Sequence, residues 1–227
     1  MASPEQWTEH YPTCGGSRQS PINIKTSTEA DLPARALNSC RTFNLTQSDE
    51  SFKGEDVFGD CSVSTNTATY DFTQFHFHSP SEHTLDGEVL DGEINFVHKK
   101  SDGSASLVVV GLFLQAGDFK TDPWMVPVLD GMDMVTPEEW QTVKLTPYAD
   151  LINTKVDANR VYNYPGSLTT PACDEIVDWW VVPTPVQISS KDLERLQTNL
   201  KKLHLTDDGK NARPVQELNG RSVTSLK

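Results

Sequence analysis

Two histidines separated by one residue are the feature of this chain that most clearly suggests chemistry. They lie in the run Gln74-Phe75-His76-Phe77-His78. In an extended strand alternate side chains share a face, so both imidazoles point to one side while Phe75 and Phe77 point to the other. Two imidazoles held side by side on a rigid strand provide half of a zinc site. The alternative is a pair of ordinary polar residues on a strand face.

A second segment has to supply the third ligand. The run Glu93-Ile94-Asn95-Phe96-Val97-His98 follows, and the position that should face the two histidines is occupied by Asn95. Between the two segments, Ser81-Glu82-His83 adds a carboxylate and another imidazole. The ligand set is therefore the central question that the sequence poses.

Short alternating runs typical of β-strands dominate the chain. We expect strands over residues 69–78, 93–99, 107–115 and 176–182, separated by Asp-Gly turns. The run from 107 to 114 is apolar on both faces, as expected for a strand in the middle of a sheet that is covered on both sides.

Helical patterns are few. Ser189 or Ser190 caps a segment with leucines at helical spacing, which predicts an amphipathic helix lying on the sheet. The leucines are Leu193, Leu196, Leu200 and Leu203. The run 136–139, with proline at its first helical position, predicts a second short helix. No linker divides the sequence, so we expect one mostly β (α+β) domain over residues 1–227.

Composition and charge exclude several classes of protein. The 227 residues are 36% hydrophobic and 22% charged, with a net charge of -13. This charge argues against binding to nucleic acid, because phosphates would be repelled. No apolar run approaches the roughly 18 residues that a membrane-spanning helix needs. Nothing in the sequence indicates an oligomeric state.

The four cysteines are Cys14, Cys40, Cys61 and Cys173, and none forms a CxxC pair. Their spacing is wrong for a thiolate zinc site, and an even number of dispersed cysteines fits two disulfides in an oxidising compartment. Three pairings are open, and four buried free thiols are the alternative. Asn44-Leu45-Thr46 is a glycosylation sequon. No signal peptide precedes Trp7, so we expect a processed or truncated chain.

Longer motifs give these observations a context. Ser81-Glu82-His83, the run from Tyr164 to Pro171, Arg18-Gln19-Ser20-Pro21-Ile22-Asn23-Ile24 and Arg213-Pro214-Val215-Gln216 occur in this order. Together with the two histidines they resemble the α-class carbonic anhydrases, and the resemblance covers nearly the whole chain except about residues 40–69. It implies a twisted, mainly antiparallel sheet of about ten strands with a few short surface helices.

The resemblance also implies roles for individual residues. In the family a zinc ion is held by three histidines and a water, and His76, His78 and Asn95 stand at the three protein positions. Gln74 and Glu93 would orient ligand imidazoles. Thr169 and Glu82 would orient zinc-bound hydroxide toward CO2, giving bicarbonate. The substrate-binding wall would consist of Val97, Val109, Leu168, Thr170, Val177 and Trp179.

Asn95 replaces the family's third histidine. That histidine binds through Nδ1, which is bonded to Cγ just as the asparagine Oδ1 is, so Oδ1 could occupy nearly the same point. An amide oxygen is a harder and poorer zinc donor than imidazole. We therefore expect one weakly bound Zn2+ per chain, with another divalent metal as an alternative. A second alternative is a catalytically silent carbonic-anhydrase-related binding or storage protein.

Three further expectations follow from the resemblance. It pairs Cys14 with Cys173, as in secreted members, and leaves Cys40 with Cys61; the location would be extracellular, periplasmic or an organelle lumen. No histidine lies between His10 and His76, where fast members carry a proton shuttle, so we expect slow turnover or rescue by buffer. His83 and His98 are expected to be structural. Secondary esterase activity would accompany CO2 hydration.

Overall fold

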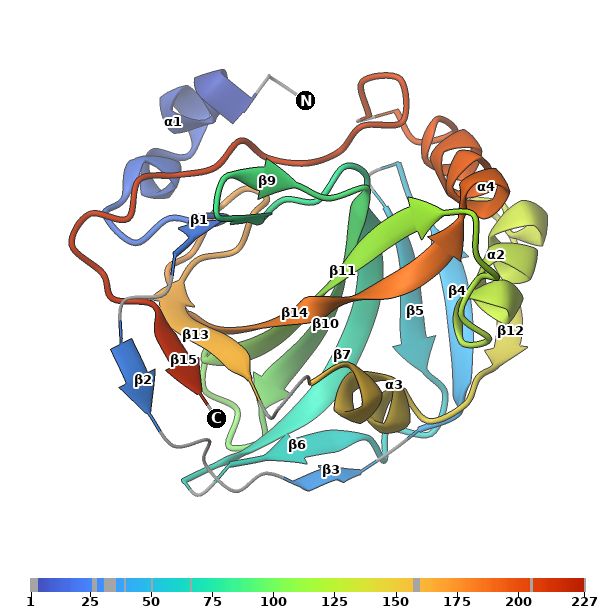
Figure 1. Cartoon of the computed structure of the whole chain (residues 1–227), viewed down its shortest axis with the longest axis horizontal. Coiled ribbons are helices and arrows are strands. Elements are labelled where there is room, and N and C mark those ends of the chain that lie inside the picture. Colours follow the sequence, from blue (N-terminus) through green and yellow to red (C-terminus); the bar gives the residue numbers. More distant parts are fainter. Residues whose placement is uncertain are drawn as a thin grey trace.

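The computed structural model describes residues 4–25, 28–30, 36–38, 40–49, 51–65, 67–156, 160–204 and 206–226. Its framework is a twisted 12-stranded sheet (Figure 1). The main path runs β12-β4-β5-β7-β10-β11-β14-β13-β15-β2, and β6 pairs with both β7 and β3. Pairing is antiparallel except between β11 and β14 and between β15 and β2. The predicted fold class, a large and mainly antiparallel sheet, is confirmed.

The strands of this sheet differ widely in length. They are β2 (Thr28–Ala30), β3 (Ala36–Asn38), β4 (Thr42–Gln47), β5 (Phe52–Asp56), β6 (Ser62–Ser64), β7 (Thr69–His78), β10 (Gly92–Lys100), β11 (Leu107–Gly117), β12 (Gln141–Lys144), β13 (Val161–Gly166), β14 (Val177–Ser189) and β15 (Thr224–Leu226). A smaller sheet consists of β1 (Asn23–Ile24), β8 (Thr84–Leu85) and β9 (Glu88–Val89). The strands expected at 69–78, 93–99, 107–115 and 176–182 correspond to β7, β10, β11 and β14.

The large sheet separates two apolar layers. One contains Phe75, Phe77 and Phe96, which pack with Trp124 and Tyr148. We call it the phenylalanine layer. The other contains Val97, Val109, Val177, Val181 and Trp179, and we call it the valine layer. Alternation along β7 and β10 therefore sends these phenylalanines to one side and the His76 and His78 side chains to the other.

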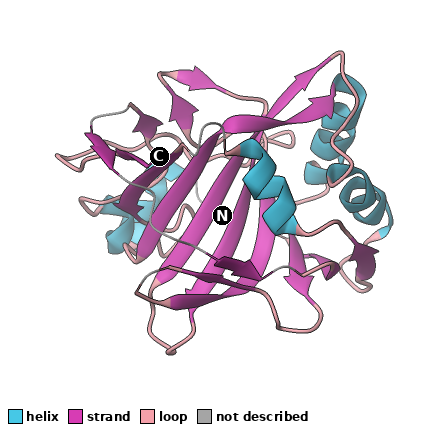
Figure 2. Cartoon of the chain, turned by 60° about the horizontal axis from the view of Figure 1, so that its bottom comes forward, coloured by secondary structure: helices cyan, strands magenta, loops and turns pink. Residues whose placement is uncertain are grey.

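Helices pack outside the sheet: in Figure 2 a helix crosses in front of the strands and others lie to the sides. They are α1 (Trp7–His10), α2 (Met125–Met134), α3 (Tyr148–Lys155) and α4 (Ser190–Leu200). The predicted leucine helix is confirmed as α4, which begins after Ser189, whose hydroxyl accepts a hydrogen bond from the Asp192 N–H at 3.1 Å. Arg195 of α4 binds Asp130 and Asp133 of α2, at 2.7 Å each. None of the described helices is long and apolar enough to cross a membrane.

The prediction of a helix at residues 136–139 is wrong. Helix α2 ends at Met134, and Val135 is extended. Thr136 and Glu139 then exchange two backbone hydrogen bonds, at 3.1 and 3.3 Å, around a tight turn that contains Pro137. Proline fixes a backbone angle that suits a β-turn as well as a first helical turn. No apolar periodicity follows it, so the turn is not extended into a helix.

Two disulfides link distant segments. They join Cys14 with Cys173 and Cys40 with Cys61, as the family resemblance implied. The first connects the N-terminal segment to the loop after β13, which carries Thr169. The second connects the start of β4 to the start of β6. All four cysteine side chains are buried.

His98 is a buried group whose charge state affects stability. It lies against Phe72, with 5.5 Å between ring centroids, and its Nε2 shares a hydrogen bond of 3.1 Å with the Tyr148 hydroxyl. Burial lowers the pKa of His98 from 6.5 to about 4. His98 is thus a structural residue of the phenylalanine layer, as expected from the sequence.

We expect the free energy of unfolding to fall as the pH drops from about 6.5 to about 4, because the unfolded chain takes up this proton first. His98→Phe keeps the ring contacts and should remove about 2–3 kcal/mol of that pH dependence. Urea denaturation of both proteins between about pH 7 and pH 4 checks this. Identical slopes against pH would contradict it, since carboxylates contribute equally to both proteins.

Candidate metal centre

A single row of residues across the sheet brings the predicted ligands together. His76 on β7 faces Asn95 on β10, and on its other side faces Lys53 on β5. Asn95 in turn faces Gly111 on β11. Residues directly opposite each other in neighbouring strands have Cβ atoms about 5 Å apart and share a face. The row therefore places Lys53, His76 and Asn95 side by side above the sheet.

The two imidazoles are oriented by acceptors behind them. His76 Nδ1 lies 2.9 Å from Gln74 Oε1, and His78 Nδ1 lies 3.2 Å from the carbonyl oxygen of Asn211. Because both partners are oxygen acceptors, each Nδ1 carries the proton and each Nε2 keeps a lone pair. The ring centroids are 5.0 Å apart. Nε2 of His78 is buried and has no hydrogen-bond partner in the described structure.

Asn95 is a buried amide without partners. Its side chain is 1% exposed, and neither Oδ1 nor Nδ2 forms a hydrogen bond within the part of the chain that the structure describes. A buried amide left in this state costs free energy. Gly111 has no side chain beside this amide: a Cβ there would lie 3.4 Å from Asn95 Oδ1 and 3.1 Å from Glu93 Oε1. Both of these oxygens, which are acceptors, therefore lie close to Gly111.

Glu93 is the centre of a buried hydrogen-bond network. Its Oε2 accepts from the backbone N–H groups of Glu82 and His83 at 3.0 and 2.9 Å, and its Oε1 lies 2.8 Å from His83 Nδ1. His83 Nε2 lies 2.6 Å from the Tyr164 hydroxyl. Burial raises the pKa of Glu93, but the His83 contacts outweigh it and the net shift is downward. His83 is structural, as expected; none of these bonds joins Glu93 to a predicted ligand.

Glu82 lies between the ligand histidines and the loop that carries Thr169. Its Oε1 accepts from the Arg213 backbone N–H at 3.0 Å, and its Oε2 lies 3.3 Å from His78 Nε2. Burial raises the pKa of Glu82, and the neighbouring His78 ring and hydrogen bonds from Arg213 and Thr169 oppose this shift. Both Glu82 and Thr169 are buried. The pair that the sequence predicted is therefore adjacent.

The predicted substrate wall lies within the valine layer. Val97, Val109, Val177 and Trp179 are buried members of one cluster, and Leu168 packs against it. Trp179 is fixed by its Nε1–H, which donates to the Ser167 carbonyl at 3.0 Å. Thr170 differs from the others because it is exposed. The structure thus brings five of the six wall residues together beside the polar row.

Comparison with known proteins identifies the architecture. The family model described as "Eukaryotic-type carbonic anhydrase" matches residues 2–227. "Carbonic anhydrase 7" of Mus musculus is 32% identical over 97% of this chain and 92% of its own length. "Alpha carbonic anhydrase 3" of Arabidopsis thaliana is 32% identical over 98% and 80%. The chain belongs to the eukaryotic-type carbonic anhydrase family.

Solved structures agree with this assignment. The α-carbonic anhydrase of Thermovibrio ammonificans, solved in complex with the inhibitor sulfanilamide, has a TM-score of 0.81 and 30% identity, covering 97% of this chain and 94% of that one. Carbonic anhydrase Cah3 of Chlamydomonas reinhardtii, in complex with acetazolamide, has the same TM-score and 27% identity. α-Carbonic anhydrases are zinc enzymes, so the comparisons support the lyase class and CO2 hydration in general.

Three residues of the site were not identified from the sequence. Asn211 and Arg213 reach His78 and Glu82 from more than 130 positions away. Arg213 belongs to a motif of the family resemblance, which could have indicated it. Lys53 lies in the stretch that matches the family poorly. It is half-buried, and burial, His78 and then Lys53 lower the pKa of His76 well below 6.5.

Lys53 should weaken metal binding, because its positive charge lies next to a ligand of a divalent cation. Lys53→Met should therefore tighten zinc binding about tenfold, as expected for charges several ångströms apart when one of them is half-buried. Competition with a calibrated chelator measures this affinity.

Lys99→Met is the matched control. Lys99 is exposed and pairs in register with Asp71, farther along the same strands. It changes the net charge equally, and its zinc affinity should equal that of the wild type. Equal affinities for all three proteins would show that the Lys53 ammonium does not act on the site.

Proposed function

We propose that this carbonic anhydrase hydrates CO2 reversibly to bicarbonate with a zinc ion held by His76, His78 and Asn95. The observation that carries the proposal is a set of buried atoms without hydrogen bonds, His78 Nε2 and the Asn95 amide, on the same sheet face as the His76 ring; the neighbour of His78 Nε2 is the Glu82 carboxylate, at 3.3 Å. A cation bound there would give these lone pairs a partner. The intact neighbourhood of Glu82, Thr169 and the apolar wall supports the same function.

The donor set fits zinc, with a weaker third ligand. Two imidazole nitrogens and one amide oxygen are neutral, so the metal would keep its full charge. A cation would give the Asn95 amide oxygen the partner that it lacks among the described residues. Because an oxygen donor is harder than imidazole, we expect reduced affinity for zinc and keep another divalent metal as an alternative.

The protein groups would perform the remaining tasks. When bound, zinc would supply Lewis acidity that makes a coordinated water acidic near neutral pH, as is known for carbonic anhydrase. Glu82 would accept the Thr169 hydrogen, which leaves the Thr169 oxygen as an acceptor for the attacking oxygen. The backbone N–H of Arg213 stabilises the ionised form of Glu82. Val97, Val109 and Trp179 would hold uncharged CO2 without competing water.

Location and modification are part of the proposal. The two disulfides support an oxidising compartment, such as the extracellular space, the periplasm or an organelle lumen. Asn44, the candidate glycosylation site, lies in β4 and accepts a hydrogen bond of 2.8 Å from Thr142. A glycan would be attached to Nδ2, so the Asn44 Oδ1 that accepts this bond could keep it. The domain boundaries, 1–227, also stay a prediction.

Zinc titration of chelator-stripped protein tests the function. Stopped-flow CO2 hydration should rise with zinc and saturate, and a sulfonamide should abolish it. Asn95→His should lower the zinc concentration needed for half-maximal activity at least about tenfold, because imidazole is the better donor. Asn95→Leu, which keeps the volume and removes the oxygen, should raise it. Background activity in the wild type at every zinc concentration would favour the catalytically silent alternative.

Proton release should limit turnover at saturating zinc. Of the six histidines, His10 and His204 are exposed, while His83 and His98 are buried in hydrogen bonds. The other two are the predicted ligands, and His10 and His204 lie outside the strands that carry the site, so we expect no histidine relay. Imidazole buffer should therefore raise kcat for hydration several-fold without changing kcat/KM. Rapid turnover that is independent of buffer concentration would refute this.

A further inference from the structure

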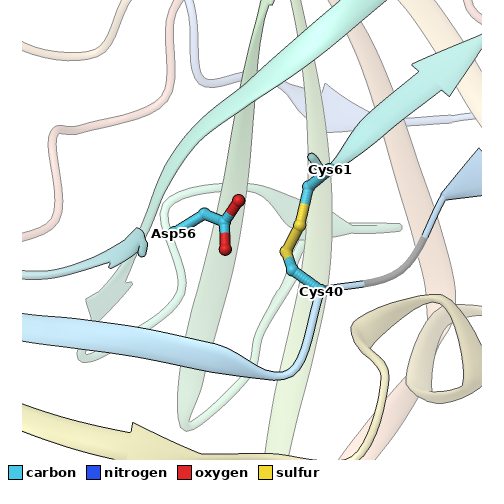
Figure 3. A group of neighbouring side chains, drawn as sticks. All are labelled: Cys40, Asp56 and Cys61. Atoms are coloured by element: carbon cyan, nitrogen blue, oxygen red, sulfur yellow. A yellow bond between two sulfur atoms is a disulfide. The ribbon is translucent and has the colours of Figure 1, made fainter. Parts of the chain in front are cut away.

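A second group of potential metal ligands lies away from the candidate metal centre. It consists of Cys40, Cys61 and Asp56, with one ligand atom from each within 4.8 Å of the others. Figure 3 shows the Asp56 carboxylate turned toward the bridge between the two cysteines. Both cysteines belong to the phenylalanine layer, the opposite side of the sheet from His76. The group is therefore separate from the proposed function and does not depend on it.

The Asp56 carboxylate lacks a partner for one oxygen. Oδ2 accepts a hydrogen bond of 3.1 Å from the Asp60 N–H. Oδ1 is buried and has no hydrogen-bond partner in the structure as described. An unpaired buried carboxylate oxygen is costly, and a disulfide offers it no donor. The oxidised bridge therefore leaves a negative oxygen beside two sulfur atoms without a positive partner.

We propose that Cys40, Cys61 and Asp56 form a second metal site, opened by reduction of the disulfide, for a thiophilic divalent cation such as zinc or cadmium. Thiolates select such metals, and a carboxylate oxygen is an accepted third ligand for zinc. The cation would give Asp56 Oδ1 the partner that it lacks.

A phosphine can reduce the disulfide between Cys40 and Cys61. A phosphine attacks one sulfur, the S–S bond breaks, and water converts the adduct to phosphine oxide and two thiols. The phosphine is oxidised by two electrons and the disulfide is reduced by two. The cation then displaces one proton from each thiol and forms two metal–sulfur bonds. Asp56 Oδ1 donates a lone pair without losing a proton.

The distances suit a tetrahedral ion. Zn–S bonds of 2.3 Å and a Zn–O bond near 2.0 Å imply sulfur–sulfur and sulfur–oxygen separations of about 3.5–3.8 Å. The ligand atoms already lie within 4.8 Å of one another, and the cysteine Cα atoms are 5.3 Å apart. The sulfur atoms can separate to this distance by side-chain rotation. The strand ends that carry the ligands can therefore stay in place.

The other disulfide provides an internal comparison. Cys14 and Cys173 are also buried, and their Cα atoms are 4.9 Å apart. Among the described residues, no aspartate, glutamate or histidine completes a group of three with them. Reduction of that bridge should give two thiols without a third ligand. The carboxylate is what distinguishes the two bridges.

Cadmium titration of the phosphine-reduced chain tests the proposal. The ultraviolet sulfur-to-cadmium charge-transfer band reports thiolate ligands only, so it does not respond to cadmium at His76 and His78. We expect one cadmium ion per chain with two sulfur ligands. The same band should appear in the Cys14→Ser/Cys173→Ser variant and be absent in Cys40→Ser/Cys61→Ser. Asp56→Asn, which keeps the shape and removes the charge, should weaken cadmium binding about tenfold or more.

Two results would refute the proposed second metal site. One is a band that persists in Cys40→Ser/Cys61→Ser and disappears in Cys14→Ser/Cys173→Ser. The other is unchanged affinity in Asp56→Asn. If reduction unfolds the chain, cadmium should restore near-ultraviolet circular dichroism in the wild type at concentrations that leave Asp56→Asn unfolded, because binding is coupled to folding. Equal recovery in both proteins would also refute the role of Asp56.

Discussion

The register between β7 and β10 is the constraint on which the rest of the site depends. It places His76 opposite Asn95 and His78 opposite Glu93. A slip by one residue would turn both histidines into the phenylalanine layer and the phenylalanines to the face that carries the polar row. Phe75 and Phe96, fully buried and 5.8 Å apart between ring centroids, stand in the same register on the other face. Aromatic packing on one side of the sheet thus fixes the positions of polar groups on the other.

Buried charge is the second constraint. Glu82 and Glu93 are both almost fully buried, and two carboxylates in an apolar layer would be unstable alone. Backbone N–H groups and His83 compensate Glu93, while Arg213 compensates Glu82. The Arg213 guanidinium also binds the carbonyl oxygens of Ser20 and Cys14, at 2.8 and 3.1 Å. Arg213 therefore connects Glu82 to the segment that carries the Cys14–Cys173 bridge through hydrogen bonds.

The sequence predicted what local alternation and periodicity determine. The period of two along 69–78 placed the histidines on one face and the phenylalanines on the other, and the leucine spacing located α4. The sequence did not indicate that Lys53 lies beside His76. This position depends on how β5 pairs with β7, and the residues around β5 contain no recognisable motif. The turn at Thr136 was misread for a related reason. Its proline is compatible with two conformations, and the choice depends on where α2 ends.

Asn95 shows that the fold and the metal ligands are separable. Six buried phenylalanines pack in the phenylalanine layer, and the network of Glu93, His83 and Tyr164 includes none of the predicted ligands. Neither would lose a contact if the third ligand changed from imidazole to amide. Under the proposed ligand set, this is how a chain can keep the architecture of its relatives, with a TM-score of 0.81, while one metal ligand changes. Similarity of fold therefore constrains the positions of these side chains but not the metal affinity. Under the proposed ligand set, that affinity depends on one amide oxygen, Oδ1 of Asn95.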